Sequence, residues 1–283
     1  MIHCKELNKD FETKKEMFSE LVKNRDVIIA QKKSIKKEVD CNVLISPVIV
    51  RDKKDVSIKE DIIPDVNLDQ LKVIVIINTT NYLDGHGDVH IPGIWNKTLR
   101  ENKMLMHLQE HEMEFDKIIA DGKELKAYVK NYTWAELGYS YEGVTEGLTF
   151  ESTILRKRNP FMLNQYANGW VKNHSVGMYY VKMDFAINDE DNPNEFEAWN
   201  KYYPEIANKE DADEKGYFWY VLEAKLIEGS AVPLGSNPVT PTLENELENQ
   251  PEKSTEEIII EPSNDTRKGI DYEYLIQNLK LKK

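Results

Sequence analysis

Short runs of apolar and β-branched residues, each bounded by turn residues, fill most of the chain between residues 71 and 234. These runs are LKVIVIINTT, GLTFESTIL, VGMYYVKMDF and YFWYVLEAKLIEGSAVPL, and NVLISPVIV precedes them at residues 42–50. Runs of this composition are typical of β-strands. Few of them alternate with helical patterns, so a doubly wound parallel sheet is not expected. The pattern favours an α+β fold or a barrel decorated with helices.

Two shorter segments contain residues that are typical of a helix start and of a tight turn. PGIWNKTLREN, at residues 92–102, predicts a helix with proline in its first turn. DKIIADGKELKAYV, at residues 116–129, predicts a hairpin with Asp121 and Gly122 at its turn.

The two ends of the chain differ from its body at residues 41–240. Residues 1–40 are expected to form a helical arm, because apolar residues recur every three, four and seven positions over 5–39 without proline or glycine. The narrow apolar stripe of this arm suits packing on the body or on a partner. Residues 188–216 predict an acidic insertion with a short helix. Residues 241–283 are expected to be a polar, flexible tail that ends in a short helix.

Charge excludes several functional classes. The 283 residues carry a net charge of −13, and phosphate binding needs clustered Lys and Arg, so a nucleic-acid binder is not expected. Residues 184–261 hold 20 acidic and 5 basic side chains, whereas residues 1–40 hold 8 and 10. This asymmetry suggests docking on a larger assembly, or self-association.

No apolar run approaches the roughly 18 residues of a membrane span, no secretory signal opens the sequence, and two cysteines suit a reduced cytoplasmic setting.

The segment HLQEH at residues 107–111 matches the H-x-x-E-H pattern of inverted zinc peptidases. On a helix, His107 and His111 would share one face and Glu110 could polarise a metal-bound water. DGHGDVH at residues 84–90 also resembles a metal site, but a tight turn at Gly87, capped by the aspartate that follows it, Asp88, is the better interpretation.

A serine–histidine pairing is a third possibility, centred on KNHSVGMYYV. If this run is a strand, Ser175, Gly177 and Tyr179 face one way and His174 faces the other. His174 is therefore badly placed to act as a base for Ser175. A base for Ser175 must come from another strand.

The order of these motifs resembles the caudovirus prohead (capsid maturation) serine protease family, which is distantly similar in fold to the herpesvirus assemblins. The blocks are NYLDGHGDVHIPGIWNKT, HLQEHE, GLTFES, NGWVKNHSVGMYY and YVLEAKLIEGSAVPLGSNP, within residues 73–240. The family shows an N-x-D-x-x-GD-x-x-x-PGAF-x-KTL block, then QHD-like, GLxxEG, G-x-S-x-G-like and E-V-S-x-V-xx-PANP blocks. The resemblance implies a mostly antiparallel β-barrel with surrounding helices, and it implies neither a cofactor nor a metal.

The resemblance also implies a catalytic triad. Ser175 corresponds to the nucleophile, and His111 to the histidine of the QHD block, here followed by Glu112. Glu228, which opens the closing block, corresponds to the acid, where the assemblins use a second histidine. On this basis His111 would take the proton of Ser175 and Glu228 would orient His111. His107 would flank the site from the same face of a strand as His111, and a loop within 229–235 would supply oxyanion donors.

The function implied is that of a serine endopeptidase inside the immature phage capsid, in the host cytoplasm. Its substrates would be scaffold and major capsid protein segments, and it would trim itself, with the tail as a cleavage or targeting segment. Self-association is expected, and neither a membrane nor a specific nucleic acid is expected as a partner. Two alternatives stay open: a catalytically inactive capsid-assembly or scaffold-binding protein of the same fold, and a zinc peptidase that uses HLQEH.

Overall fold

The computed structural model describes residues 1–34 and 68–245, and these form an α+β fold, as predicted. The α-helices are α1 (Lys14–Lys23), α2 (Arg25–Ser34), α3 (Asn96–Glu101), α4 (Pro160–Ala167), α5 (Pro193–Tyr202) and α6 (Lys209–Lys215). The 3₁₀ turns are η1 (Phe115–Lys117), η2 (Gly122–Glu124) and η3 (Tyr203–Glu205). The strands are β1 (Ile2–Cys4), β2 (Lys9–Phe11), β3 (Gln70–Thr79), β4 (Asp88–His90), β5 (Met106–Gln109), β6 (Ile118–Asp121), β7 (Leu125–Thr133), β8 (Val144–Leu155), β9 (Asn173–Ile187), β10 (Tyr217–Val232) and β11 (Thr242–Asn245).

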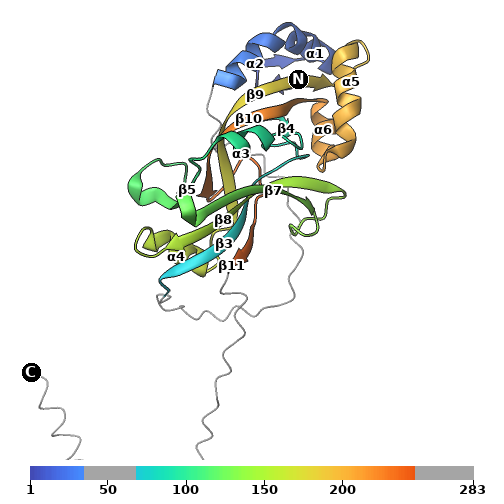
Figure 1. The fold of residues 1–283 in the computed structure, drawn as a ribbon. Helices are drawn as coiled ribbons and strands as arrows, with labels where there is room; N and C mark the ends of the chain where they lie inside the picture. The colour runs from blue at the N-terminus through green and yellow to red at the C-terminus, as the bar shows by residue number, and fades with distance from the viewer. Residues whose placement is uncertain (35–67, 246–283) are drawn as a thin grey trace, which may run out of the picture. The chain divides into compact units, whose positions relative to one another are not determined.

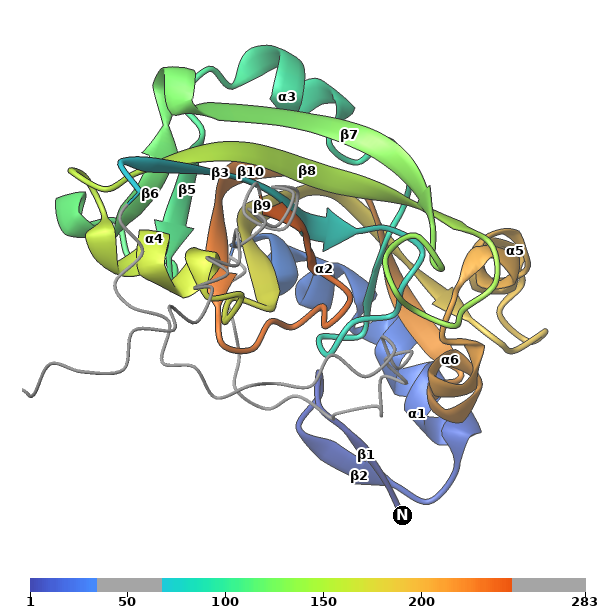
Figure 2. The ribbon, with the colours of Figure 1, turned by 90° about the horizontal axis from the view of Figure 1, so that it is seen from below.

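The long antiparallel pair β9–β10 is the centre of the fold. β10 also pairs in parallel with β4 near its start and with β5 near its end, and β5 pairs with β6. A second sheet has the order β11-β3-β8-β7 and is antiparallel throughout. Figure 2 shows this second sheet lying across β9 and β10. In Figure 1, α1, α2, α5 and α6 group around one end of the β9–β10 pair, and α4 lies near the other.

One edge of β10 pairs with β9, and the middle of its other edge contacts the helix α3 instead of a strand. The Leu226 N–H donates to Thr98 Oγ1 in α3, and Nδ2 of Asn102, the residue that follows α3, donates to the Leu226 carbonyl. These side chains satisfy backbone groups that a neighbouring strand would otherwise bind. β10 can therefore join β4 and β5 at separate places along one edge.

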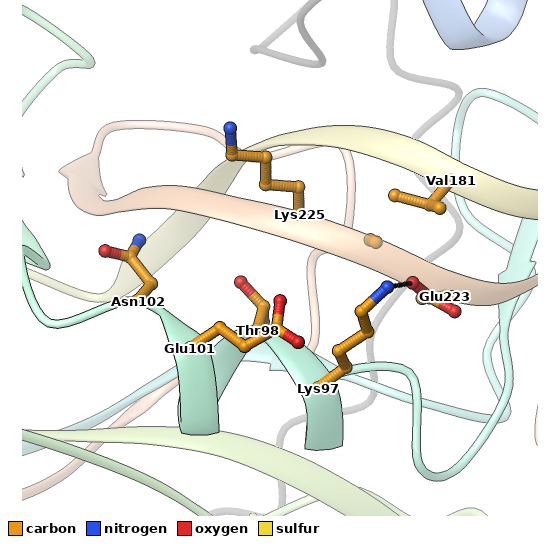
Figure 3. A pocket seen from close by; sticks show the side chains of 8 residues that line it. Lys97, Thr98, Glu101, Asn102, Val181, Glu223 and Lys225 are labelled. Atoms are coloured by element: carbon orange, nitrogen blue, oxygen red, sulfur yellow. Dashed lines mark hydrogen bonds and ion pairs between the residues drawn. The ribbon is translucent and has the colours of Figure 1, made fainter.

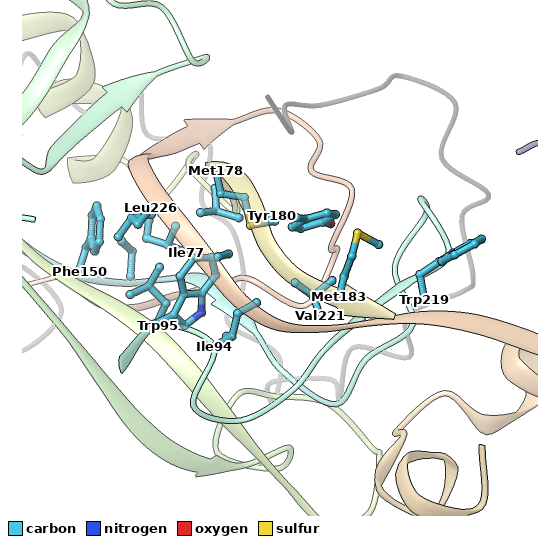
Figure 4. Close-up of a cluster of buried hydrophobic side chains, with 14 of the residues drawn as sticks. Ile77, Ile94, Trp95, Phe150, Met178, Tyr180, Met183, Trp219, Val221 and Leu226 are labelled. Carbon is cyan, nitrogen blue, oxygen red and sulfur yellow. The ribbon is translucent and has the colours of Figure 1, made fainter. Parts of the chain in front are cut away.

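The main core fills the space between the two sheets. β3, β8, β9 and β10 each contribute alternate apolar residues, among them Ile77, Phe150, Met178 and Leu226 (Figure 4). All four are at most 3% exposed. Burying side chains of this size contributes about 1.5–3 kcal/mol each, so this cluster fixes the register of β9 against β10.

The strand predictions succeed for four of the five runs, which form β3, β8, β9 and β10. The fifth, at residues 42–50, lies outside the described residues. The hairpin predicted at residues 116–129 is wrong in its pairing, because β6 pairs with β5 and β7 pairs with β8 along its nine residues. The predicted helix at 92–102 is shorter, since Gly93 at φ 92° forms a turn before α3 begins.

The predicted helix over residues 5–39 is also wrong in its first part. The chain begins with the hairpin β1–β2, and α1 starts after Thr13, whose side chain accepts from the Glu16 N–H. Asn24 separates α1 from α2 and binds back to the Glu20 carbonyl. Apolar residues of both helices, such as Leu21, belong to the main core, so the described part of this segment packs on the body.

The acidic segment 188–216 is more ordered than a loop with one helix. It contains α5, η3 and α6, which enclose a small apolar cluster around Trp199, Ile206 and Phe218. The segment predicted as a tail starts with β11, which pairs with β3, and residues 246–283 lie outside the description. No helix among the described residues has the length and apolar character needed to cross a membrane.

Candidate active site

The β9–β10 ladder gathers the predicted nucleophile and the predicted acid on one face. Ser175 lies opposite Ser230, and Gly177 lies opposite Glu228. Directly opposed residues of an antiparallel pair point to the same side, so all four residues share a face. Gly229 lies on the reverse face, where an added Cβ would come within 2.9 Å of Ile77 and closer still to Phe150 in the core.

His111 reaches this face from the end of β5. The strand ends at Gln109, and Glu110 and His111 then adopt left-handed backbone conformations with φ of 53° and 63°. The turn is held by two hydrogen bonds to β10: Glu110 N–H donates to the Ala231 carbonyl at 2.9 Å, and His111 N–H donates to Ser230 Oγ at 3.2 Å. The turn aims the His111 ring at Glu228, with 2.7 Å between Nδ1 and Oε1.

Glu228 is fully buried, and its second carboxylate oxygen accepts a hydrogen bond from Ser230 Oγ at 2.6 Å. The side chain lies directly over Gly177. A Cβ at Gly177 would come 1.8 Å from Glu228 Oε1, a distance that no real contact allows. Glycine at position 177 is therefore a requirement of the Glu228–His111 contact.

The structure joins His111 to Glu228 and places Ser175 beside them without joining it to His111. The Ser175 residue is 6% exposed, and the described residues show no hydrogen bond between its Oγ and His111. His111 Nε2 is buried and has no partner among them. Catalytic hydrogen bonds are often long or misaligned without substrate and shorten when it binds. The missing hydrogen bond between Ser175 and His111 therefore does not remove Ser175 as a candidate nucleophile.

This arrangement suits a general base. A carboxylate that accepts a hydrogen bond from the ring Nδ1 favours the tautomer with its proton on Nδ1, which leaves Nε2 as the proton acceptor. The same carboxylate stabilises the imidazolium once Nε2 takes a proton. His111 and Glu228 together can therefore withdraw a proton from a hydroxyl on the Ser175 face.

The prediction that His107 and His111 share a face is wrong, both for a helix and for a strand. His107 lies on β5 and points into the core, where its Nδ1 lies 2.9 Å from Ser152 Oγ. The left-handed turn reverses the direction of His111 relative to His107. The fully buried His107 cannot flank a substrate. HLQEH therefore lacks the geometry of a zinc motif, and the described part of the chain has no group of three or more His, Cys, Asp or Glu residues that could hold a metal ion.

His174 faces away from Ser175, in agreement with the alternation predicted for this strand. It is fully buried and shares the Tyr166 hydroxyl with His107, at 2.9 Å and 3.2 Å. Its Nδ1 lies 2.9 Å from the Thr240 carbonyl. Burial lowers the pKa of His107 well below its ordinary value, and the nearby His174 lowers it further. This histidine pair is therefore a neutral part of the core behind the site.

Acid is expected to destabilise the protein through His174. Burial lowers the pKa of His174 from 6.5 to about 4, against an opposing effect of the Thr240 backbone. The unfolded chain binds a proton at His174 below pH 6.5, but the folded chain does so only near pH 4. The free energy of unfolding therefore falls as the pH drops through this window, by about 3 kcal/mol for this residue. Denaturant titrations at pH 7 and pH 4 measure the loss. His174→Gln should show a smaller difference between the two pH values, and an equal difference would contradict the prediction.

The DGHGDVH segment forms the predicted turn, but Asp88 does not cap it. Gly87 takes a φ of 73°, and Asp84 is the capping residue, because its Oδ1 accepts from the N–H groups of His86 and Asp88. The Asp88 carboxylate instead accepts hydrogen bonds from the Lys32 ammonium and the Tyr180 hydroxyl. The role of this motif is structural.

Two depressions lie near the β9–β10 pair. The larger, of about 410 Å³, lies between α3 and β10, and Ser175, His111 and Glu228 do not line it (Figure 3). The second, of about 270 Å³, is lined by Glu110 and Ala231, which are the chain neighbours of His111 and Ser230. Two exposed aromatic residues, Phe161 and Trp170, also line this second depression, and the sequence offered no signal for them.

Ser230 is a further residue of the site that sequence reasoning missed. Its hydroxyl contacts both Glu228 and the His111 backbone. The available signal was its spacing of two from Glu228 within a strand, which places both side chains on one face.

No protein-family model, curated protein or solved structure matches the chain.

Proposed function

We propose that the protein is a serine endopeptidase with Ser175 as nucleophile, His111 as general base and Glu228 as the residue that orients the base. The observation that carries the proposal is the buried contact between His111 Nδ1 and Glu228 Oε1, 2.7 Å long, on the sheet face that bears Ser175. The three residues are distant in sequence: Ser175 lies on β9, His111 in the turn after β5 and Glu228 on β10. Such convergence is the usual condition of a catalytic triad.

The proposed reaction is acyl transfer to water. Ser175 Oγ attacks the carbonyl carbon of the peptide bond while its proton moves to His111 Nε2. The tetrahedral intermediate expels the amine, which takes the proton from Nε2, and an ester with Ser175 remains. A water molecule then attacks this ester, again losing a proton to His111, and releases the carboxylic acid and the Ser175 hydroxyl.

The biological setting of the proposal rests on the motif order. We infer an assemblin-like barrel assembled from the two sheets, and the mostly antiparallel pairing and surrounding helices support this arrangement. The substrates would be scaffold and major capsid protein segments within the phage procapsid, in the host cytoplasm. Self-cleavage and self-association belong to the same proposal, and neither a membrane nor a specific nucleic acid does.

One observation favours a second candidate function, a non-catalytic capsid-assembly protein of the same fold. It is the lack of a hydrogen bond between Ser175 and His111 among the described residues. A protein of this kind would keep its partner surfaces and perform no proteolysis.

A fluorophosphonate probe separates the two functions without knowledge of the substrate. An activated serine forms a bond from its Oγ to phosphorus and fluoride leaves, so the protein gains mass at one residue. We expect mass spectrometry to place the label on Ser175 in the folded protein and to find none in Ser175→Ala. His3→Ala, which changes an exposed histidine paired with Asp10, is the matched control and should label normally. A folded protein that stays unlabelled would favour the assembly function.

A further inference from the structure

We propose that Ser230 is a positioning residue that holds the Glu228 carboxylate and the His111 turn in the arrangement that the base requires. Its catalytic consequence rests on the function proposed above. The structural part of the proposal stands on the contacts of Ser230 alone.

Ser230 links Glu228 and His111 through a single hydroxyl group. Its Oγ donates to Glu228 Oε2 at 2.6 Å and accepts from the His111 N–H at 3.2 Å. A hydroxyl carries one donor and two acceptor positions, so both bonds can exist together. Glu228 accepts at Oε2 from Ser230 and at Oε1 from the His111 ring, and a carboxylate held at both oxygens cannot rotate.

The backbone bond to Ser230 matters because the His111 turn is an uncommon one. Glu110 and His111 both have positive φ, although neither is glycine. Such conformations persist only where surrounding contacts determine them. One of these contacts is the His111 N–H bond to Ser230, and another is the Glu110 N–H bond to the next residue of β10, Ala231.

The two serines that face each other across the ladder therefore have different roles. Ser230 has no exposed surface, and its proton lies in the bond to Glu228. Ser175 is 6% exposed, whereas the two Glu228 oxygens bind Ser230 and the His111 ring. Ser230 thus acts through His111 and Glu228, and Ser175 is the residue of the pair that can meet a substrate.

The first test compares the rate at which fluorophosphonate labels Ser175 in three variants of the full chain. Ser230→Ala is expected to lower the rate roughly 10–100-fold, the size of effect that a small misplacement of a catalytic group produces. Ser230→Thr keeps the hydroxyl and should recover most of the rate. The matched control is Ser152→Ala, which removes another fully buried strand serine bound to a histidine, His107, and should leave the rate unchanged.

The second test needs no activity. In wild-type protein the proton on His111 Nδ1 should give a low-field NMR resonance, because it lies in a buried bond to a carboxylate. The resonance should move or broaden in Ser230→Ala and stay in place in Ser175→Ala. An unchanged resonance in Ser230→Ala would overturn the positioning role whether or not the protein is an enzyme.

The outcomes separate this inference from the proposed function. If wild-type protein labels at Ser175 and Ser230→Ala labels equally fast, the positioning role is wrong and the proposed function stands. If wild-type protein does not label, the proposed function and the catalytic consequence of Ser230 are both wrong.

Discussion

Replacing Glu228 with glutamine is expected to slow fluorophosphonate labelling of Ser175 by roughly 10⁴-fold, the loss that follows when a triad acid becomes an amide. Glu228 accepts hydrogen bonds at both of its oxygens, from the His111 ring and from Ser230. An amide has one oxygen and one NH₂ group, so it can accept only one of the two. It also lacks the charge that stabilises the imidazolium. Labelling rates from quenched time courses measure the effect.

The matched control for this variant is Glu223→Gln on the same strand. Glu223 binds Lys97 and Lys182 at the surface, away from Ser175 and His111. Its replacement should leave the labelling rate within about twofold, because its two ion pairs involve none of the proposed triad residues. Comparable rates for Glu228→Gln and the wild-type protein would show that Glu228 does not orient a catalytic base.

The apolar pattern predicted strands well, whereas pairing depended on contacts that no local pattern contains. β3, β8, β9 and β10 follow from short runs of apolar and β-branched residues that are bounded by turn residues. The Asp121–Gly122 turn signal predicted a hairpin, but β6 and β7 each pair with a different strand over long sequence distances. The single helix predicted at the start is divided at Asn24, and a hairpin precedes it.

At the site, alternation placed Ser175 and His174 on opposite faces, as found. The orientation of His111 could not be predicted in this way, because period-two alternation holds only within a strand and β5 ends before His111. Two left-handed residues then reverse the chain, and the bond from His111 N–H to Ser230 helps to hold them. The pairing of His111 with Glu228 was expected from motif order alone, since neither residue type nor spacing relates positions 111 and 228.

The DGHGDVH segment resembles a metal site in sequence, but its carboxylates bind groups of the protein itself. Asp84 caps the turn and Asp88 follows it, a spacing that metal ligands also show, but each has a partner within the protein. The cation that Asp88 binds is the ammonium of Lys32, from α2. A single sequence cannot reveal that the cation is a lysine 56 positions earlier in the chain.

Replacing Asp88 with asparagine is therefore expected to destabilise the protein by about 3–5 kcal/mol, the cost of leaving one charge of a buried pair uncompensated. The Lys32 side chain is 10% exposed, that of Asp88 is fully buried, and their charged atoms lie 2.5 Å apart. Asparagine keeps the shape and removes the charge, so the Lys32 ammonium would lose the carboxylate it binds directly and keep the His86 carbonyl, the Trp219 ring and the more distant charge of Glu6. The midpoint of thermal unfolding should fall by roughly 10 °C for a chain of this size.

The exposed pair between Lys15 and Asp191 is the matched control, because it also has a separation of 2.5 Å but side chains that are 77% and 63% exposed. Asp191→Asn should leave the unfolding midpoint almost unchanged, since water solvates both charges whether or not they pair. Burial, not distance, is the difference between the two pairs. Equal small shifts for both variants would mean that Lys32 reaches solvent in solution and that Asp88 does not tie α2 to β4.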